Sequence, residues 1–205
     1  MTFDEYQDWL RCTVAYAGND HRLGANEAPP AIVSLYLGDE LMAVLDSIEN
    51  DTTYEKTDSG TLRYAHALPR LAKDSTDRNR TSPFAFTGNK FEFRMLGSSA
   101  SVADPNIVLN TIVAEAFATA VEKLEKALKT QDFDSAVKAY TEKLLKKHYR
   151  IIFNYNGYGP EWEEEAARRG LLNHKTTADA AEEWFKKETV DVFVRQGVYT
   201  KNEVL

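Results

Sequence analysis

The character of the chain changes near residue 102, and this change limits the possible folds more than any other feature. Before it, short β-rich segments alternate with turn-forming residues, whereas after it the apolar residues recur at helical spacing. Residues 90–95 alternate strictly between charged and apolar side chains, which is typical of a half-buried strand. The pattern predicts an α+β chain, with a sheet-forming part over residues 1–102 and a helical part over residues 103–205.

Periodicity and start and stop signals place the individual elements. Gly18 is expected to end the first helix, and Asp104 and Pro105 suit the cap and first position of a long one. Thr176 or Thr177 is expected to cap the helix that begins at residue 177. Residues 49–80 show little periodicity and are expected to form a long excursion. The expected helices cover 3–17, 38–48, 105–129, 134–154, 161–169, 177–187 and 189–196, and the expected strands cover 31–37, 84–86 and 90–95.

Composition and charge exclude several classes of protein. A chain of 205 residues that is 43% hydrophobic can bury a core without disulfides. It contains no run of apolar residues long enough for a membrane span, and its acidic start is unlike a signal peptide. A formal net charge of -7 works against nucleic acid or an anionic membrane as partner. A cytoplasmic location is expected.

The cysteine and histidine residues indicate no disulfide, no reactive thiol and no histidine metal site. Cys12 is the single cysteine, so the chain forms no internal disulfide, and its apolar neighbours favour a buried, unreactive thiol. The four histidines show no metal-ligand spacing. Residues 146–148 (Lys-Lys-His) are interpreted as a solvated helix face, and residues 156–159 as a connector.

Two segments concentrate residue types that handle metals and phosphate. In the strand over 90–95, Phe91, Phe93 and Met95 share one face, and the charged residues Lys90, Glu92 and Arg94 share the other. A carboxylate is a hard oxygen ligand for Mg²⁺, and guanidinium groups match phosphate or carboxylate. The loop over 19–30 adds His21, Arg22, Asn26 and Glu27. Taken alone, such segments are more often an ordinary half-solvated strand and a solvated turn.

Together these segments resemble motifs of the glutamine synthetases. The run NDHRLGANEAPP over residues 19–30 is similar to the family loop that reads Arg-Leu, a few small residues, then Glu-Ala-Pro. Residues 79–81 resemble its Asn-Arg-Ser/Thr element, and residues 90–94 resemble its basic-x-Glu-x-Arg element, in the same order. The exact residues of these motifs are similar to those of the type III branch, and the match is strong over residues 15–37 and 76–102.

The resemblance implies a fold and an activity. The fold would be a partial antiparallel sheet of the glutamine synthetase catalytic domain, followed by a helical C-terminal region. The activity would be ATP-dependent joining of ammonia to glutamate, through a γ-glutamyl phosphate held by two divalent metals, Mg²⁺ or Mn²⁺. The partners would be glutamate, ATP and ammonium, in a homo-oligomer whose active sites lie between subunits.

The resemblance also implies a role for individual residues. Phosphoryl transfer depends mostly on positioning and charge neutralisation, which agrees with a site of arginines and carboxylates. Many family members carry an arginine where this chain has Ala85, so one phosphate contact is expected either to come from elsewhere or to be absent. By resemblance, Arg22 would hold a glutamate carboxylate, and Glu27 would belong to the flap that closes over the intermediate and helps deprotonate ammonium. Arg80 would neutralise the transferring phosphoryl group and contact ATP, and Lys90 would approach ATP. Glu92 would bind a metal, and Arg94 would lie near substrate or phosphate.

Part of the family's site is absent from this sequence. In the family the other metal-binding glutamates, the metal-binding histidine and an N-terminal domain precede these motifs, whereas here 17 residues precede Gly18. The chain is therefore expected to be the C-terminal part of such an enzyme and inactive alone. An alternative of a different class is a non-catalytic helical interaction module that retains inherited motifs. A phosphohydrolase is disfavoured, because no second carboxylate cluster or nucleophile–base pair accompanies Arg80 and Glu92.

Overall fold

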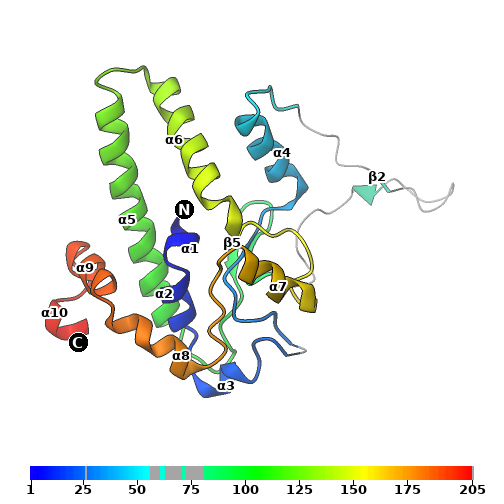
Figure 1. The fold of residues 1–205 in the computed structure, drawn as a ribbon, viewed down its shortest axis with the longest axis vertical. Coiled ribbons are helices and arrows are strands. Elements are labelled where there is room, and N and C mark those ends of the chain that lie inside the picture. Colours follow the sequence, from blue (N-terminus) through cyan, green and yellow to red (C-terminus); the bar gives the residue numbers. More distant parts are fainter. Residues whose placement is uncertain (26, 56–60, 63–70, 73–80, 205) are drawn as a thin grey trace.

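The computed structural model describes residues 1–25, 27–55, 61–62, 71–72 and 81–204. Helices surround a small sheet, so the predicted α+β class is confirmed (Figure 1). Within these residues, no helix has both the length and the apolar character that crossing a membrane requires.

The N-terminal segment forms three short helices. These are α1 (Thr2–Glu5), α2 (Gln7–Cys12) and α3 (Ala17–Asp20). The prediction of one helix ending at Gly18 was wrong, because Tyr6 and Tyr16 leave the helical conformation, with φ/ψ of -120°/29° and -155°/152°. Gly18 lies inside α3 instead. The breaks fold the segment tightly enough to bury Trp9 and Leu10 almost completely.

The main sheet contains β1 (Leu35–Tyr36), β4 (Phe84–Phe86) and β5 (Phe91–Phe93), in the order β1-β4-β5. β4 and β5 form the predicted antiparallel hairpin, and Gly88 in its turn has φ +94°. β1 pairs with β4 in parallel, so the sheet is mixed rather than wholly antiparallel. A parallel pair needs a crossover connection, which here includes α4 (Gly38–Glu49).

Two expectations before β4 need adjustment. Residues 31–34 are buried as expected, but only Leu35 and Tyr36 of the segment 31–37 pair as a strand. Most of the excursion over 49–80 lies outside the described residues. Its described part includes a small antiparallel pair, β2 (Thr61–Leu62) with β3 (Leu71–Ala72).

The remainder of the chain is helical, as predicted. Val102, not Asp104, occupies the N-cap position of α5, and no side chain caps this helix. Thr176 and Asp179 form a reciprocal capping box at the start of α8, which confirms the predicted cap. The elements are α5 (Ala103–Ala127), α6 (Phe133–His148), η1 (Tyr149–Ile151), α7 (Pro160–Arg168), α8 (Thr177–Ala181), η2 (Glu182–Phe185), α9 (Lys187–Arg195) and α10 (Lys201–Val204).

The main hydrophobic core draws on both sides of residue 102. It includes Trp9 from α2, Met95 after β5, Ile112 from α5 and Phe193 from α9. A smaller cluster joins Ile32 to α7 and the residues that follow it. Because one core spans the predicted boundary, the division into 1–102 and 103–205 stays a prediction.

Two predictions about buried groups have opposite outcomes. Cys12 is buried, and burial raises the pKa of its thiol to about 12, so the expectation of an unreactive thiol is confirmed. His148 was expected on a solvated face, and this was wrong. Its side chain is 4% exposed and lies 2.7 Å from a carboxylate oxygen of Asp4. The carboxylate partner makes burial of the ring at the end of α6 possible.

Candidate functional site

A cavity of about 650 Å³ lies where the loop after α3 meets β5. Four of the six predicted site residues line it, namely Arg22, Glu27, Glu92 and Arg94, and they come from segments far apart in the sequence. The other lining residues are Ala28, Pro29, Leu96 and Ser98. Two guanidinium groups and two carboxylates therefore share one concave surface.

The charged face of β5 supplies one side of this cavity. The carboxylate of Glu92 accepts from the Nη2 of Arg94 at 3.1 Å and lies 3.2 Å from the Nζ of Lys90. Hydrogen bonds from these two cations lower the pKa of Glu92, so the carboxylate is ionised at neutral pH. Glu92 and Arg94 share the cavity, as the alternation predicted, whereas Lys90 is exposed and is not among the residues that line it.

The apolar face of the strand differs in part from the prediction. Met95 is fully buried and Phe93 is half-buried, but Phe91 is 47% exposed. Phe91 lies next to the hairpin turn, where its ring stacks on Phe84 at 5.5 Å and contacts Phe86 at 5.2 Å. Burial of Phe91 was expected, and this was wrong, because Phe91 is the first residue of β5 and lies at the turn end of the strand, away from the core around Met95.

Arg22 supplies the opposite side of the cavity and is tied to the end of β5. Its Nη1 donates to the backbone carbonyl of Met95 at 3.0 Å and to Oδ1 of Asn19 at 3.1 Å. Its Nη2 donates to the carbonyl of Arg94 at 3.1 Å. Among the described residues, Nε and the second hydrogen of Nη2 have no acceptor. Arg22 therefore keeps two donors for an anion in the cavity.

The loop that carries Glu27 is closed by backbone hydrogen bonds. The amide of Gly24 donates to the carbonyls of Ala28 and Pro29, at 3.2 and 2.9 Å, and Gly24 adopts φ +80°. Glu27 is exposed within the loop and lines the cavity. At the start of this segment, Asn19 in α3 is fully buried. Closure of the Glu27 flap over the cavity stays a prediction.

Two further positions of the family pattern can be placed only in part. Arg80, with its neighbours Arg78 and Asn79, lies outside the described residues. Ala85 is fully buried in β4 and pairs directly with Glu92, so the two residues share a face of the sheet. Its methyl group has no polar atom to contact a phosphate, so a contact at this position would have to come from another residue.

The described residues do not form a complete divalent-metal site. They contain no group of three His, Cys, Asp or Glu side chains placed to hold an ion. Of the two carboxylates in the cavity, Glu92 already pairs with Lys90 and Arg94. Mg²⁺ and Mn²⁺ prefer several oxygen ligands. Within the described part of the chain, Glu92 offers one such ligand and no more.

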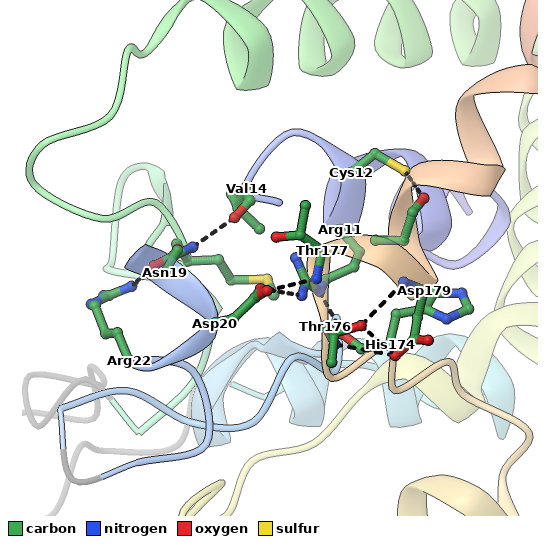
Figure 2. Close-up of polar contacts among 12 residues, drawn as sticks. Arg11, Cys12, Val14, Asn19, Asp20, Arg22, His174, Thr176, Thr177 and Asp179 are labelled. Carbon is green, nitrogen blue, oxygen red and sulfur yellow. Dashed lines mark hydrogen bonds and ion pairs between the residues drawn. The ribbon is translucent and has the colours of Figure 1, made fainter. Parts of the chain in front are cut away.

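One residue next to the site was missed by the sequence interpretation. Asn19 is fully buried and contacts both Arg22 and the end of β5. Its segment consists of polar turn formers, which predicts a solvated loop, so no signal in the sequence pointed to it. Figure 2 shows Asn19 between Arg22 and Val14, beside a second polar network around Arg11 and Asp20.

Comparison with known proteins agrees with the motifs. Residues 136–205 match the family model of the glutamine synthetase C-terminal domain. The chain is 45% identical over 202 residues to the type-3 glutamine synthetase of Dictyostelium discoideum, and 43% identical over 201 residues to the glutamine synthetase of Butyrivibrio fibrisolvens. It is 39% identical over 211 residues to the glutamine synthetase of Bacteroides fragilis (strain YCH46).

These matches cover at least 98% of this chain, while the chain spans only 28–29% of the length of the three relatives. The predicted resemblance to the type III branch of glutamine synthetase is thereby confirmed. Over nearly its whole length, the chain is similar to one segment of these glutamine synthetases.

Proposed function

We propose that this chain supplies part of the substrate site of an enzyme that joins ammonia to glutamate at the expense of ATP, through γ-glutamyl phosphate. One observation carries the proposal. The cavity brings together Arg22 and Arg94, which are 72 residues apart in the sequence, with the carboxylates of Glu27 and Glu92. The resemblance assigns a role in this reaction to all four residues.

The cations suit the anionic groups of such a reaction. Arg22 has two unused donors that can take a carboxylate of glutamate in a charge-assisted pair. Arg94 lies across the cavity and would contact the substrate or the transferred phosphoryl group. Lys90 would approach ATP, and Arg80 would neutralise the phosphoryl group. Positive groups placed where negative charge develops lower the barrier to phosphoryl transfer.

Glu27 suits the second half of the reaction. It is exposed at the edge of the cavity, on a loop segment whose base is fixed by Gly24. Closure of this segment would place the carboxylate over γ-glutamyl phosphate and exclude water that would otherwise hydrolyse it. The carboxylate would attract ammonium and accept a proton as ammonia attacks.

Other parts of the proposed enzyme site would be supplied from outside this chain. The remaining ligands of Mg²⁺ or Mn²⁺ would come from outside the described residues, because these hold no group of three side chains placed to bind an ion. The chain spans 28% of the length of its relative from Dictyostelium discoideum, so we expect no glutamine formation by the chain alone. In the complete protein we propose a cytoplasmic homo-oligomer with active sites between subunits.

One observation favours the alternative, a non-catalytic helical interaction module. α5 exposes Phe117 by 68% and Val121 by 54%, which leaves apolar surface available for a partner. Titration with Mn²⁺ separates the two functions. Weak binding that is lost in Glu92→Ala supports an inherited enzyme site, whereas its complete absence supports the module or a fragment that lacks too many of the metal ligands.

The substrate role of Arg22 is testable in a complete enzyme in which this chain replaces the matching segment of the Dictyostelium discoideum relative. Because Lys cannot reproduce the guanidinium fork, Arg22→Lys should raise the KM for glutamate about tenfold. The KM for ATP should stay unchanged. Arg168→Lys, on the exposed face of α7, is the matched control. An equal rise in both KM values would contradict the assignment.

A further inference from the structure

The side chain of Asn19 connects three parts of the molecule that meet beneath the cavity (Figure 2). Its Nδ2 donates to the carbonyl of Val14 at 2.8 Å and to the carbonyl of Met95 at 3.0 Å. Its Oδ1 accepts from Nη1 of Arg22 at 3.1 Å. The residue is fully buried, so water does not compete for these three bonds.

The contacts of Arg22 show why Asn19 matters for the direction of the guanidinium. Among the described residues, Arg22 otherwise donates only to the backbone carbonyls of Arg94 and Met95, which follow β5. Within the described part of the chain, Asn19 supplies its one side-chain acceptor. Because Asn19 and the carbonyl of Met95 occupy both hydrogens of Nη1, the unused donors are confined to Nε and Nη2.

We propose that Asn19 is a positioning residue for Arg22, which fixes the guanidinium plane so that its unused donors are presented to an anionic ligand. The ligand class is a carboxylate, and this part rests on the proposed function, in which Arg22 holds glutamate. Asn19 itself contacts no substrate. Asn19 affects ligand binding by fixing the orientation of the Arg22 guanidinium. A guanidinium that rotates freely would not keep this orientation.

Asp20 provides a matched control on the same short helix. Its carboxylate accepts from Nη2 of Arg11 at 3.0 Å and from the backbone amide of Thr177 at 2.6 Å. Figure 2 shows these contacts on the side of α3 that faces the C-terminal helices, away from Arg22. Asp20→Asn should therefore lower the stability of the protein without changing the orientation of Arg22.

The test is nitrogen-15 NMR of the arginine side chains in the 205-residue chain. In the wild type, the Nη protons of Arg22 should give separate signals, because hydrogen bonds slow rotation about Nε–Cζ. Asn19→Ala and Asn19→Leu, the second of which fills the buried space, should each speed this rotation about tenfold, as expected for loss of one charged hydrogen bond. Asp20→Asn should leave it unchanged.

Averaged Nη signals of Arg22 in the wild type would overturn the proposal, and so would rotation unaffected by either substitution at Asn19. Titration with glutamate separates this proposal from the proposed function. If glutamate binds, both Asn19 variants should weaken binding about tenfold. Slow rotation in the wild type that is lost in the variants, without any glutamate binding, would support the positioning role and count against glutamate as the ligand.

Discussion

Buried Asp4 and His148, together with the exposed Arg150, form a polar cluster that joins the start of the chain to the end of α6. Asp4 Oδ2 lies 2.7 Å from Nδ1 of His148, and Asp4 Oδ1 accepts from Nε of Arg150 at 2.8 Å. Both Asp4 and His148 are 4% exposed. Burial lowers the pKa of His148 below its usual value of 6.5, although the hydrogen bond to Asp4 opposes the effect.

Because of His148 in this cluster, the free energy of unfolding should depend on pH. Because the pKa of His148 is lower in the folded protein, the unfolded chain binds this proton more tightly, and the contribution is complete above pH 6.5 and lost as the pH falls below it. Relative to His148→Gln, the wild type should lose up to about 1.4 kcal/mol per pH unit. Urea unfolding at pH 7.5, 6.5 and 5.5 measures this difference. A difference that stays constant would show that folding does not shift the pKa of His148, and one that grows in favour of the wild type at low pH would show that the folded state favours the protonated ring.

At the scale of elements, the β4–β5 hairpin separates a structural face from a functional one. Met95 is 1% exposed in the main core, whereas Phe91 is 47% exposed beside the turn. Met95→Ala should lower the free energy of unfolding by about 2–5 kcal/mol, because it leaves a cavity in the core. Phe91→Ala should cost about 1 kcal/mol, since mainly its contacts with Phe84 and Phe86 are lost. Equal losses in chemical denaturation would mean that the apolar face extends along the whole strand.

The sequence predicts the elements whose stabilising forces are local. Strict alternation placed Glu92 and Arg94 on one face, and the capping pattern placed the start of α8 at Thr176. The exposure of Phe91 and the burial of His148 depend on where a short strand ends and on a carboxylate 144 residues away. The break of the first helix at Tyr6 likewise follows from packing against α5 and η1, which helical periodicity does not contain.

In the candidate site, too, local sequence predicts some residues and tertiary contacts determine others. The resemblance named four residues that line the cavity, but Asn19 could not be predicted, because its importance arises only when the loop meets the end of β5. Polar turn formers are normally solvated, and tertiary hydrogen bonds reverse this tendency here.

At the scale of the whole molecule, α5 and α6 lie side by side and extend away from the sheet (Figure 1). Val113, Phe117 and Val121 are four residues apart on α5, so they form an exposed apolar stripe on one side of this helix. We expect this surface to cause self-association of the isolated chain. Sedimentation velocity from micromolar to millimolar concentration should show growing species in the wild type and fewer in Phe117→Asp. A concentration-independent monomer would contradict this expectation, and Glu125→Lys on the same helix serves as the charge-change control.

A substitution at Glu27 tests most directly whether this chain holds part of a site that forms glutamine. The measurement is glutamine formation, together with ATP binding, by the complete enzyme that carries this chain in place of the matching segment of the Dictyostelium discoideum relative. The chain alone should form no glutamine. In the complete enzyme, Glu27→Ala should lower glutamine formation about 100-fold or more, as for loss of a general base, and leave ATP binding unchanged. Glu188→Ala, on the exposed side of α9, should change neither. Unchanged glutamine formation in Glu27→Ala, or equal losses of product formation and ATP binding, would contradict the account.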